Sequence, residues 1–165
     1  MIIPIEITQL PVEDLPKIYT IDRSEEVVAM YRQNGTELEK FTREVTFPDD
    51  HNFWDHHFNY WKESINWGAE FFGAMHGDKL AGFTIVRHDL EHLTSQLMAL
   101  YVSLEYRLSG IAKSLCIDAE QSAANHGNEK MYVSATPSHS SVRFYLSQNY
   151  KPTAEPNCDL LDREP

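Results

Sequence analysis

Arg107, Gly110 and Lys113 lie at a point where an apolar run gives way to an amphipathic one, in the stretch "YVSLEYRLSGIAKSL" (residues 101–115). The first half of this stretch is typical of a buried strand and the second half of a helix. A helix start leaves backbone N–H groups without partners and carries a partial positive charge. Gly110 would let an anion approach the backbone closely, and the two cations would add charge. The stretch therefore predicts an anion site from Arg107 to Lys113.

The elements next to this stretch are predicted from hydrophobic periodicity and from turn signals. Strands are expected at residues 69–76 and 80–88, which "GDK" joins as a hairpin, and at residues 95–103. Residues 109–126 predict an amphipathic helix that ends at Gly127. A strand at 130–135, a helix at 138–148 and a short last strand beginning at "NYKP" (149–152) complete this half of the chain.

The first third of the chain predicts one strand and several helices. Residues 5–10 alternate as a strand does, and Pro11 can begin a helix over 11–21. We expect a helix over 24–34, and another that begins at Thr36 and ends before Pro48, because Thr36 and Glu39 have the spacing of a capping box. Residues 49–68 predict a further helix. The order of elements indicates one mixed α/β domain over residues 1–165.

Composition and charge narrow the class of protein. The chain has 165 residues, 42% hydrophobic and 24% charged, as is usual for a soluble globular protein, and its apolar runs are too short to cross a bilayer. Its 14 Lys and Arg against 25 Asp and Glu give a net charge of −11, which argues against nucleic-acid binding and favours positively charged partners such as amines. "MIIPIEITQL" predicts a first strand and not a signal peptide, and the two cysteines have no metal or disulfide spacing, so we expect a cytoplasmic protein.

Two motifs resemble those of a known family. Residues 107–112 match the R-x-x-G-x-A pyrophosphate motif of the GNAT superfamily, the acyl-CoA-dependent N-acyltransferases, and "SVRFYLSQNYKP" (141–152) resembles the second signature of that family. The resemblance covers about residues 70–152. It implies a mixed, mostly antiparallel central sheet with one splayed parallel pair of strands, flanked by helices.

The resemblance also implies a cofactor and an activity. The cofactor would be acetyl-CoA, with no metal, and its pyrophosphate would bind to the backbone at the helix start. The implied cofactor-binding residues are Leu100, Tyr101, Val102, Arg107, Leu108, Ser109, Gly110, Ile111, Ala112, Lys113 and Ser138. The implied activity is acetyl transfer to a primary amine of a small molecule, peptide or protein, with both substrates bound together. A non-catalytic acyl-CoA sensor or interaction module is the alternative, and Gly110 and Arg107 could also be a helix-packing glycine and a surface cation.

Tyr145 is the residue that the resemblance implies as general acid, because a hydroxyl near the departing sulfur can donate a proton. It could instead simply pack beside Phe144. Many family members have an asparagine where this chain has Ser138, and a glycine where it has Asn149. The general base stays open, with Glu70, Glu91 and Glu105 as candidates.

The segment from Asp49 to Trp67 is not determined by the family motifs and could line the acceptor side. Acidic and aromatic residues there could hold a cationic amine, namely Asp49, Asp50, Asp55, Trp54, Tyr60 and Trp61. The alternative is an amphipathic helix with an aromatic core face. His51, Asp55 and His56 lack a third ligand at compatible spacing, so we predict no metal site.

The chain ends soon after the last predicted strand, with only "TAEPNCDLLDREP" (153–165) remaining. Family members usually have a further strand. The final strand is therefore expected to be very short, to come from a second copy in a homodimer, or to be missing through truncation.

Overall fold

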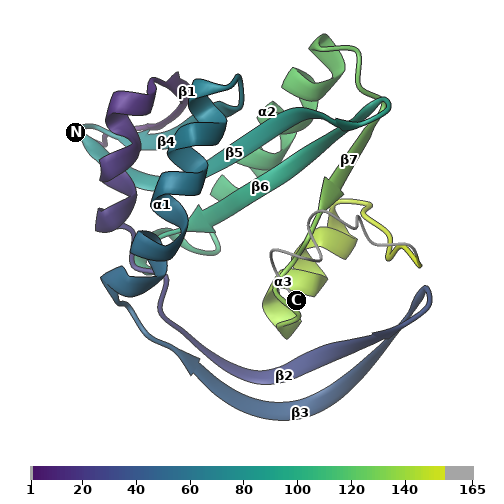
Figure 1. Cartoon of the computed structure of the whole chain (residues 1–165). Coiled ribbons are helices and arrows are strands. Elements are labelled where there is room, and N and C mark those ends of the chain that lie inside the picture. Colours follow the sequence, from purple (N-terminus) through teal and green to yellow (C-terminus); the bar gives the residue numbers. More distant parts are fainter. Residues whose placement is uncertain (1, 155–165) are drawn as a thin grey trace. The chain divides into compact units, whose positions relative to one another are not determined.

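A computed structural model describes residues 2–154 of the chain (Figure 1). The chain forms two compact units, one from Met1–Ser24 with Pro48–Val133 and one from Glu25–Phe47 with Ser134–Pro165. No helix within residues 2–154 is long and apolar enough to cross a membrane.

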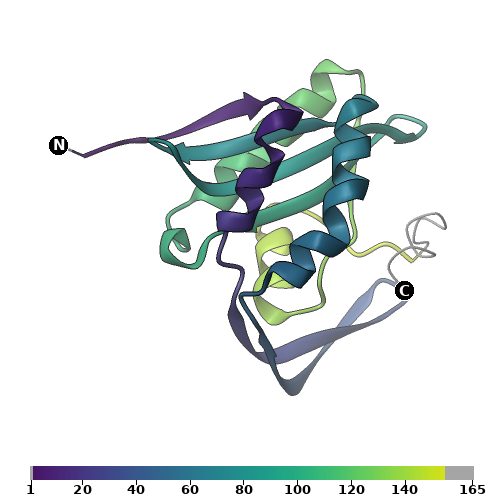
Figure 2. The ribbon, with the colours of Figure 1, turned by 60° about the vertical axis from the view of Figure 1, so that its left-hand side comes forward.

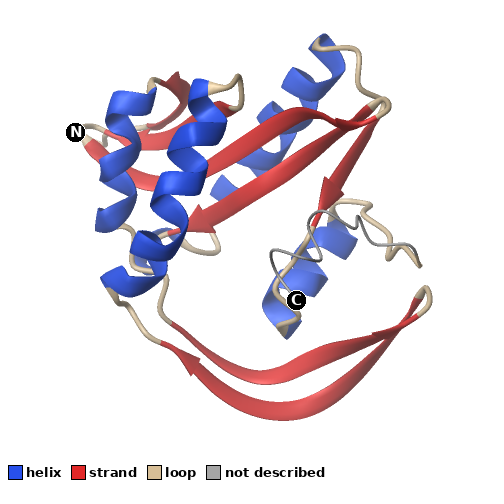
Figure 3. Ribbon diagram, in the orientation of Figure 1, coloured by secondary structure: helices blue, strands red, loops and turns tan. Residues whose placement is uncertain are grey.

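The first unit contains a five-stranded sheet in the order β1-β4-β5-β6-β7 (Figures 1 and 3). Its strands are β1 (Ile5–Leu10), β4 (Glu70–His76), β5 (Lys79–Glu91), β6 (Thr94–Val102) and β7 (Lys130–Val133). All neighbouring strands are antiparallel except β6 and β7, which are parallel. The predicted strands of this unit and the predicted mixed sheet with one parallel pair are confirmed.

Helices cover both faces of this sheet (Figure 2). On one face, η1 (Val12–Thr20) and α1 (His51–Asn66) bury large side chains against β4 and β5. The core on this face includes Leu15, Ile18, Trp54, Trp61, Phe71 and Phe83. On the other face, α2 (Ile111–Asn125) packs through Ile111 and Leu115 on Ala74 and Ala81. All three helices were predicted, although η1 is a 3-10 helix, in which Pro16 provides no N–H for an α-helical bond.

The parallel pair β6 and β7 separates part of the way along β6. The two strands pair only between Thr94–Leu97 and Lys130–Val133, whereas β6 continues to Val102, paired with β5 (Figure 1). Gly82 on β5 faces this half of β6, and a Cβ there would lie 2.9 Å from the carbonyl oxygen of Tyr101 and 3.3 Å from the side chain of Ile111. A glycine is therefore needed where the start of α2 crosses the sheet.

The second unit contains a hairpin and a helix. Strands β2 (Glu25–Asn34) and β3 (Glu37–Phe47) pair along their whole length, and α3 covers His139–Ser147, as predicted. The helices predicted over 24–34 and from Thr36 to Pro48 are therefore wrong. Gly35 and Thr36 form a two-residue turn with Gly35 at φ +64°, so "NG" marks a hairpin and not the end of a helix. Residues 26–29 also alternate between exposed and buried, as a strand does.

The segment before α3 lies beside β2. The N–H of Tyr31 donates to the carbonyl oxygen of Pro137 at 2.8 Å, and the Tyr31 ring stacks on His139. The strand predicted at 149–152 is wrong, because residues 150–153 have no strand assignment. Pro152 lacks the N–H that a ladder needs, and the N–H of Tyr150 donates to Tyr145 at the end of α3. The final strand predicted beyond these residues falls on 155–165, outside the described part of the chain.

Candidate functional site

The start of α2 presents a row of backbone donors. Leu108 and Gly110 have left-handed φ angles of +61° and +84°, and the Leu108 side chain is fully exposed. Within residues 2–154, no backbone N–H from Leu108 to Lys113 donates to a backbone carbonyl, and the first helical bond runs from Ser114 to Gly110. A Cβ on Gly110 would meet no atom within 4 Å, so there is open space beside this residue. The arrangement can bind an anion with several oxygens.

The predicted cations of this site have different surroundings. Lys113 is exposed and belongs to the first turn of α2. The guanidinium of Arg107 instead donates to three backbone carbonyls, from Nε to Val102 at 3.1 Å, from Nη1 to Ser24 at 2.7 Å and from Nη2 to Asp22 at 3.2 Å. Arg107 therefore holds the chain after η1 against the end of β6, and its charge stays close to the donor row.

The second half of β6 lies next to the donor row and has a strand neighbour on one side. Leu100, Tyr101 and Val102 pair with Thr84, Phe83 and Gly82 on one side, and β7 has already separated on the other. β7 pairs with β6 only as far as Leu97, and no strand of residues 2–154 runs along the outer side of β6 beyond that residue. An extended ligand chain could form backbone hydrogen bonds there.

Ser138 and Tyr145 belong to the second unit. Ser138 is buried at 1% exposure and caps α3, where its hydroxyl accepts a bond from the N–H of Ser141 at 3.3 Å. Tyr145 is half-buried in α3, with its ring edge-on to Phe144 and to Tyr150. Asn149 adopts φ +70°, the left-handed conformation expected where the family often has glycine. The roles of Ser138 in cofactor binding and of Tyr145 in catalysis stay predictions.

The aromatic residues of α1 are mainly core residues. Trp54 and Trp61 are 0% and 3% exposed, so the amphipathic-helix alternative describes them correctly. The carboxylate of Asp50 caps α1 by accepting from the N–H of Phe53 at 3.2 Å. Asp55 is exposed and accepts a 2.6 Å bond from the Tyr19 hydroxyl, which raises the pKa of Tyr19.

His57 on α1 is a partly buried histidine with a lowered pKa. The His57 ring stacks on Trp61. Burial lowers the pKa of His57 to about 4, and the neighbouring charges of His56 and Arg23 act in the same direction. This histidine is therefore neutral at physiological pH.

The three candidate bases lie in different places. Glu105 pairs with the exposed Lys79, and Glu91 is exposed near the end of β5. Glu70 bonds to His88 and lies near His126, in the only group of possible metal ligands found among residues 2–154. Sequence reasoning missed this group, because gaps of 18 and 38 residues carry no ligand-spacing signal.

The family model described as "Acetyltransferase (GNAT) domain" matches residues 27–159. The match covers most of the chain, and it includes the start of α2 and parts of both units. The chain therefore belongs to the GNAT acetyltransferase family, as its two motifs predicted, and is an acetyltransferase. No curated protein matches it. The prediction of a single domain over residues 1–165 stays a prediction.

Solved structures of other acetyltransferases share this fold. A nourseothricin acetyltransferase superposes with a TM-score of 0.68 at 18% identity, covering 87% of this chain and 81% of that one. An aminoglycoside acetyltransferase from an uncultured soil metagenomic sample, in complex with sisomicin, gives 0.56 at 17% identity, covering 93% and 91%. The PaiA N-acetyltransferase of Thermoplasma acidophilum, in complex with coenzyme A, gives 0.56 at 19% identity, covering 88% and 87%. At these identities the likeness concerns the fold.

Proposed function

We propose that this protein transfers an acetyl group from acetyl-CoA directly to the primary amine of a small, positively charged acceptor. The observation that carries the proposal is the row of N–H groups from Leu108 to Lys113, which have no backbone acceptor within residues 2–154, beside the half of β6 that β7 does not pair with. The pyrophosphate of coenzyme A could accept hydrogen bonds from these N–H groups. Its extended pantetheine arm could form backbone hydrogen bonds along this half of β6. The neighbour with bound coenzyme A supports this assignment.

The proposed chemistry needs no covalent enzyme intermediate. The amine nitrogen attacks the thioester carbonyl, the new C–N bond forms, and the C–S bond breaks as the amine passes a proton to a base, directly or through water. The coenzyme A sulfur leaves as a thiol if an acid protonates it, and we assign that proton to the hydroxyl of Tyr145 on the basis of the family motif. Cys116, the cysteine in the described part of the chain, is buried in α2, which is consistent with direct transfer.

A cationic acceptor is supported by charge and by the fold neighbours. The chain carries a net charge of −11, and such a field attracts cations. Two of the neighbours act on nourseothricin and on an aminoglycoside, as their names state. Asp49, which precedes the cap of α1, and Asp55, on α1, are the exposed carboxylates that remain for this role, because Asp50 serves as the helix cap.

The test is release of coenzyme A thiol from acetyl-CoA in the presence of single amines. The panel contains aminoglycosides, streptothricin-type compounds, polyamines, amino acids and peptides with a free N-terminus. Turnover with a cationic small molecule supports the proposal, whereas turnover with peptides alone would make the acceptor a protein. Calorimetric binding of acetyl-CoA without turnover on any amine would favour the non-catalytic module, which family membership does not favour.

A further inference from the structure

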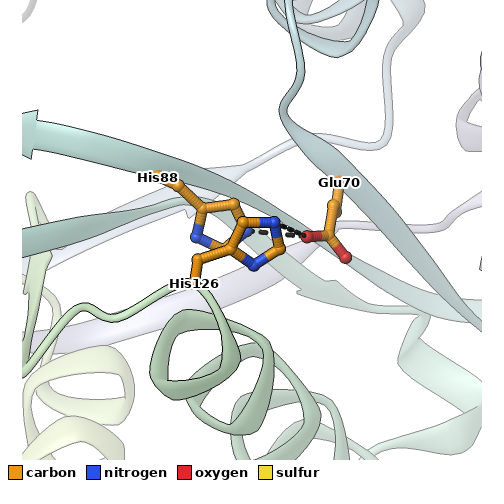
Figure 4. A group of neighbouring side chains, drawn as sticks. All are labelled: Glu70, His88 and His126. Atoms are coloured by element: carbon orange, nitrogen blue, oxygen red, sulfur yellow. Dashed lines mark hydrogen bonds and ion pairs between the residues drawn. The ribbon is translucent and has the colours of Figure 1, made fainter.

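Glu70, His88 and His126 come from three different elements and converge on one point of the first unit (Figure 4). Glu70 begins β4, His88 lies near the end of β5, and His126 follows the last residue of α2. The Glu70 Oε1 lies 2.7 Å from the Nε2 of His88 and 3.5 Å from the Nε2 of His126. One ligand atom from each residue lies within 4.8 Å of the other two.

One hydrogen bond of His126 determines which of its ring nitrogens carries the hydrogen. Its Nδ1 lies 2.9 Å from the backbone carbonyl oxygen of Ser122, and because a carbonyl only accepts, Nδ1 must carry the hydrogen. In the neutral ring the Nε2 atom then carries a lone pair, and it lies 3.5 Å from the Glu70 carboxylate oxygen. A proton on Nε2 or a metal ion between the two atoms would make this approach favourable.

The surroundings match those of a metal site. Glu70 and His88 are 15% and 7% exposed, and Ser122 Oγ donates to the Glu70 carboxylate at 2.8 Å. The Nδ1 of His88 lies 3.0 Å from Ser95 Oγ, and that of His126 donates to a carbonyl. Metal-ligating histidines usually have such a partner on the second ring nitrogen, which orients the ring.

We propose that Glu70, His88 and His126 bind a zinc ion, with water in the fourth position. Two imidazoles and one carboxylate suit zinc better than magnesium or calcium. At zinc bond lengths the ligand atoms of a tetrahedral site lie about 3.3 Å apart, between the two distances measured from Glu70. The rings of His88 and His126 stack at 3.8 Å, and binding of the ion would require the half-exposed His126 ring to tilt out of this stack while its Nδ1 keeps the bond to Ser122.

The position of this site indicates a structural role. It lies at the C-terminal end of α2, whereas the donor row lies at the N-terminal end, and 15 residues of α-helix span about 22 Å. A metal bound there would link the end of α2 to β4 and β5 without touching the acetyl-CoA site. The proposal is independent of the proposed function, and binding to the folded state alone would stabilise the first unit.

The test is calorimetric titration of the tag-free full chain with zinc chloride, together with thermal unfolding. We expect one ion per chain and a higher melting temperature with zinc. His126→Ala should raise the Kd at least about tenfold and remove the thermal shift, and Glu70→Gln should do the same. His92→Ala is the matched control, since His92 is exposed on the neighbouring turn and outside the group.

Two results would overturn the proposal. One is the absence of zinc binding by the wild-type chain, and the other is unchanged binding in His126→Ala. Because His126 is half exposed, this variant should fold without metal. A melting curve of the variant in the presence of a chelator tests whether it does. A cobalt titration gives a second readout, because four-coordinate cobalt has visible absorption bands that should appear in the wild type and not in His126→Ala.

Discussion

Replacing Gly110 by aspartate tests the donor row most directly. At φ +84° a non-glycine residue is strained, and a Cβ there would point into open space. Like charges about 4 Å apart repel by about 1 kcal/mol in bulk water and by about 4 kcal/mol near a protein surface. A pyrophosphate carries more than one negative charge, and 1.4 kcal/mol corresponds to a factor of ten. We therefore expect Gly110→Asp to weaken acetyl-CoA binding at least about a hundredfold, measured by calorimetry.

Gly127 provides a matched control for the strain that this substitution introduces. It lies beyond the other end of α2, has φ +81° and also has open space around its Cβ. Left-handed backbone costs a non-glycine residue roughly 1 kcal/mol, so Gly127→Asp and Gly110→Asp should both lower the melting temperature by a few degrees. Only Gly110→Asp should lose acetyl-CoA binding. Equal affinity in the two folded variants would refute the assignment of the donor row to the pyrophosphate.

Four further outcomes follow from the proposed function and from the structure. Tyr145→Phe should lower kcat about a hundredfold with little change in acetyl-CoA affinity; a wild-type rate with chemistry rate-limiting would make Tyr145 a packing residue. The KM for a cationic acceptor should rise with ionic strength, because salt screens exposed charges, and a flat profile would count against charge recognition. Arg107→Lys should lower the free energy of unfolding by about 2 kcal/mol or more, because lysine cannot serve all three carbonyls; unchanged stability in denaturant melts would contradict this. His57 has a folded pKa of about 4, so its unfolded form takes up a proton first and stability should fall as pH drops from about 6.5 to 4. The loss is up to about 3 kcal/mol, reduced by the partial exposure of the ring, and His57→Phe should show a shallower slope in pH-dependent melts.

The proposed homodimer stays a prediction. It depended on a missing final strand, and residues 155–165 lie outside the described part of the chain. Light scattering at high micromolar concentration measures the oligomeric state directly, and a monomer there would exclude the homodimer.

The sequence by itself was sufficient for the elements around the donor row. The strand, the turn at Gly110 and the amphipathic helix are continuous in the chain, so local periodicity and one glycine predict their order, and the anion site between them stays a prediction. The same holds for α1, with its Asp50 cap, and for the hairpin of β4 and β5. In the first third of the chain the local signals gave wrong predictions, because capping-box spacing and "NG" occur in both helices and hairpins. Residues 25–34 form a strand because they pair with β3.

Only the tertiary structure decided what several side chains contact. Arg107 resembles a phosphate-binding cation in sequence, yet its guanidinium meets carbonyls 83 and 85 residues earlier in the chain. The spacing of Trp54 and Trp61 is compatible with an amine site and with a hydrophobic core. Their burial against Phe83 of β5 shows that they belong to the core. Glu70, His88 and His126 converge only because β4, β5 and the end of α2 pack together. Spacing along the chain reports which side chains share an element, whereas contacts between elements depend on the packing of the whole unit.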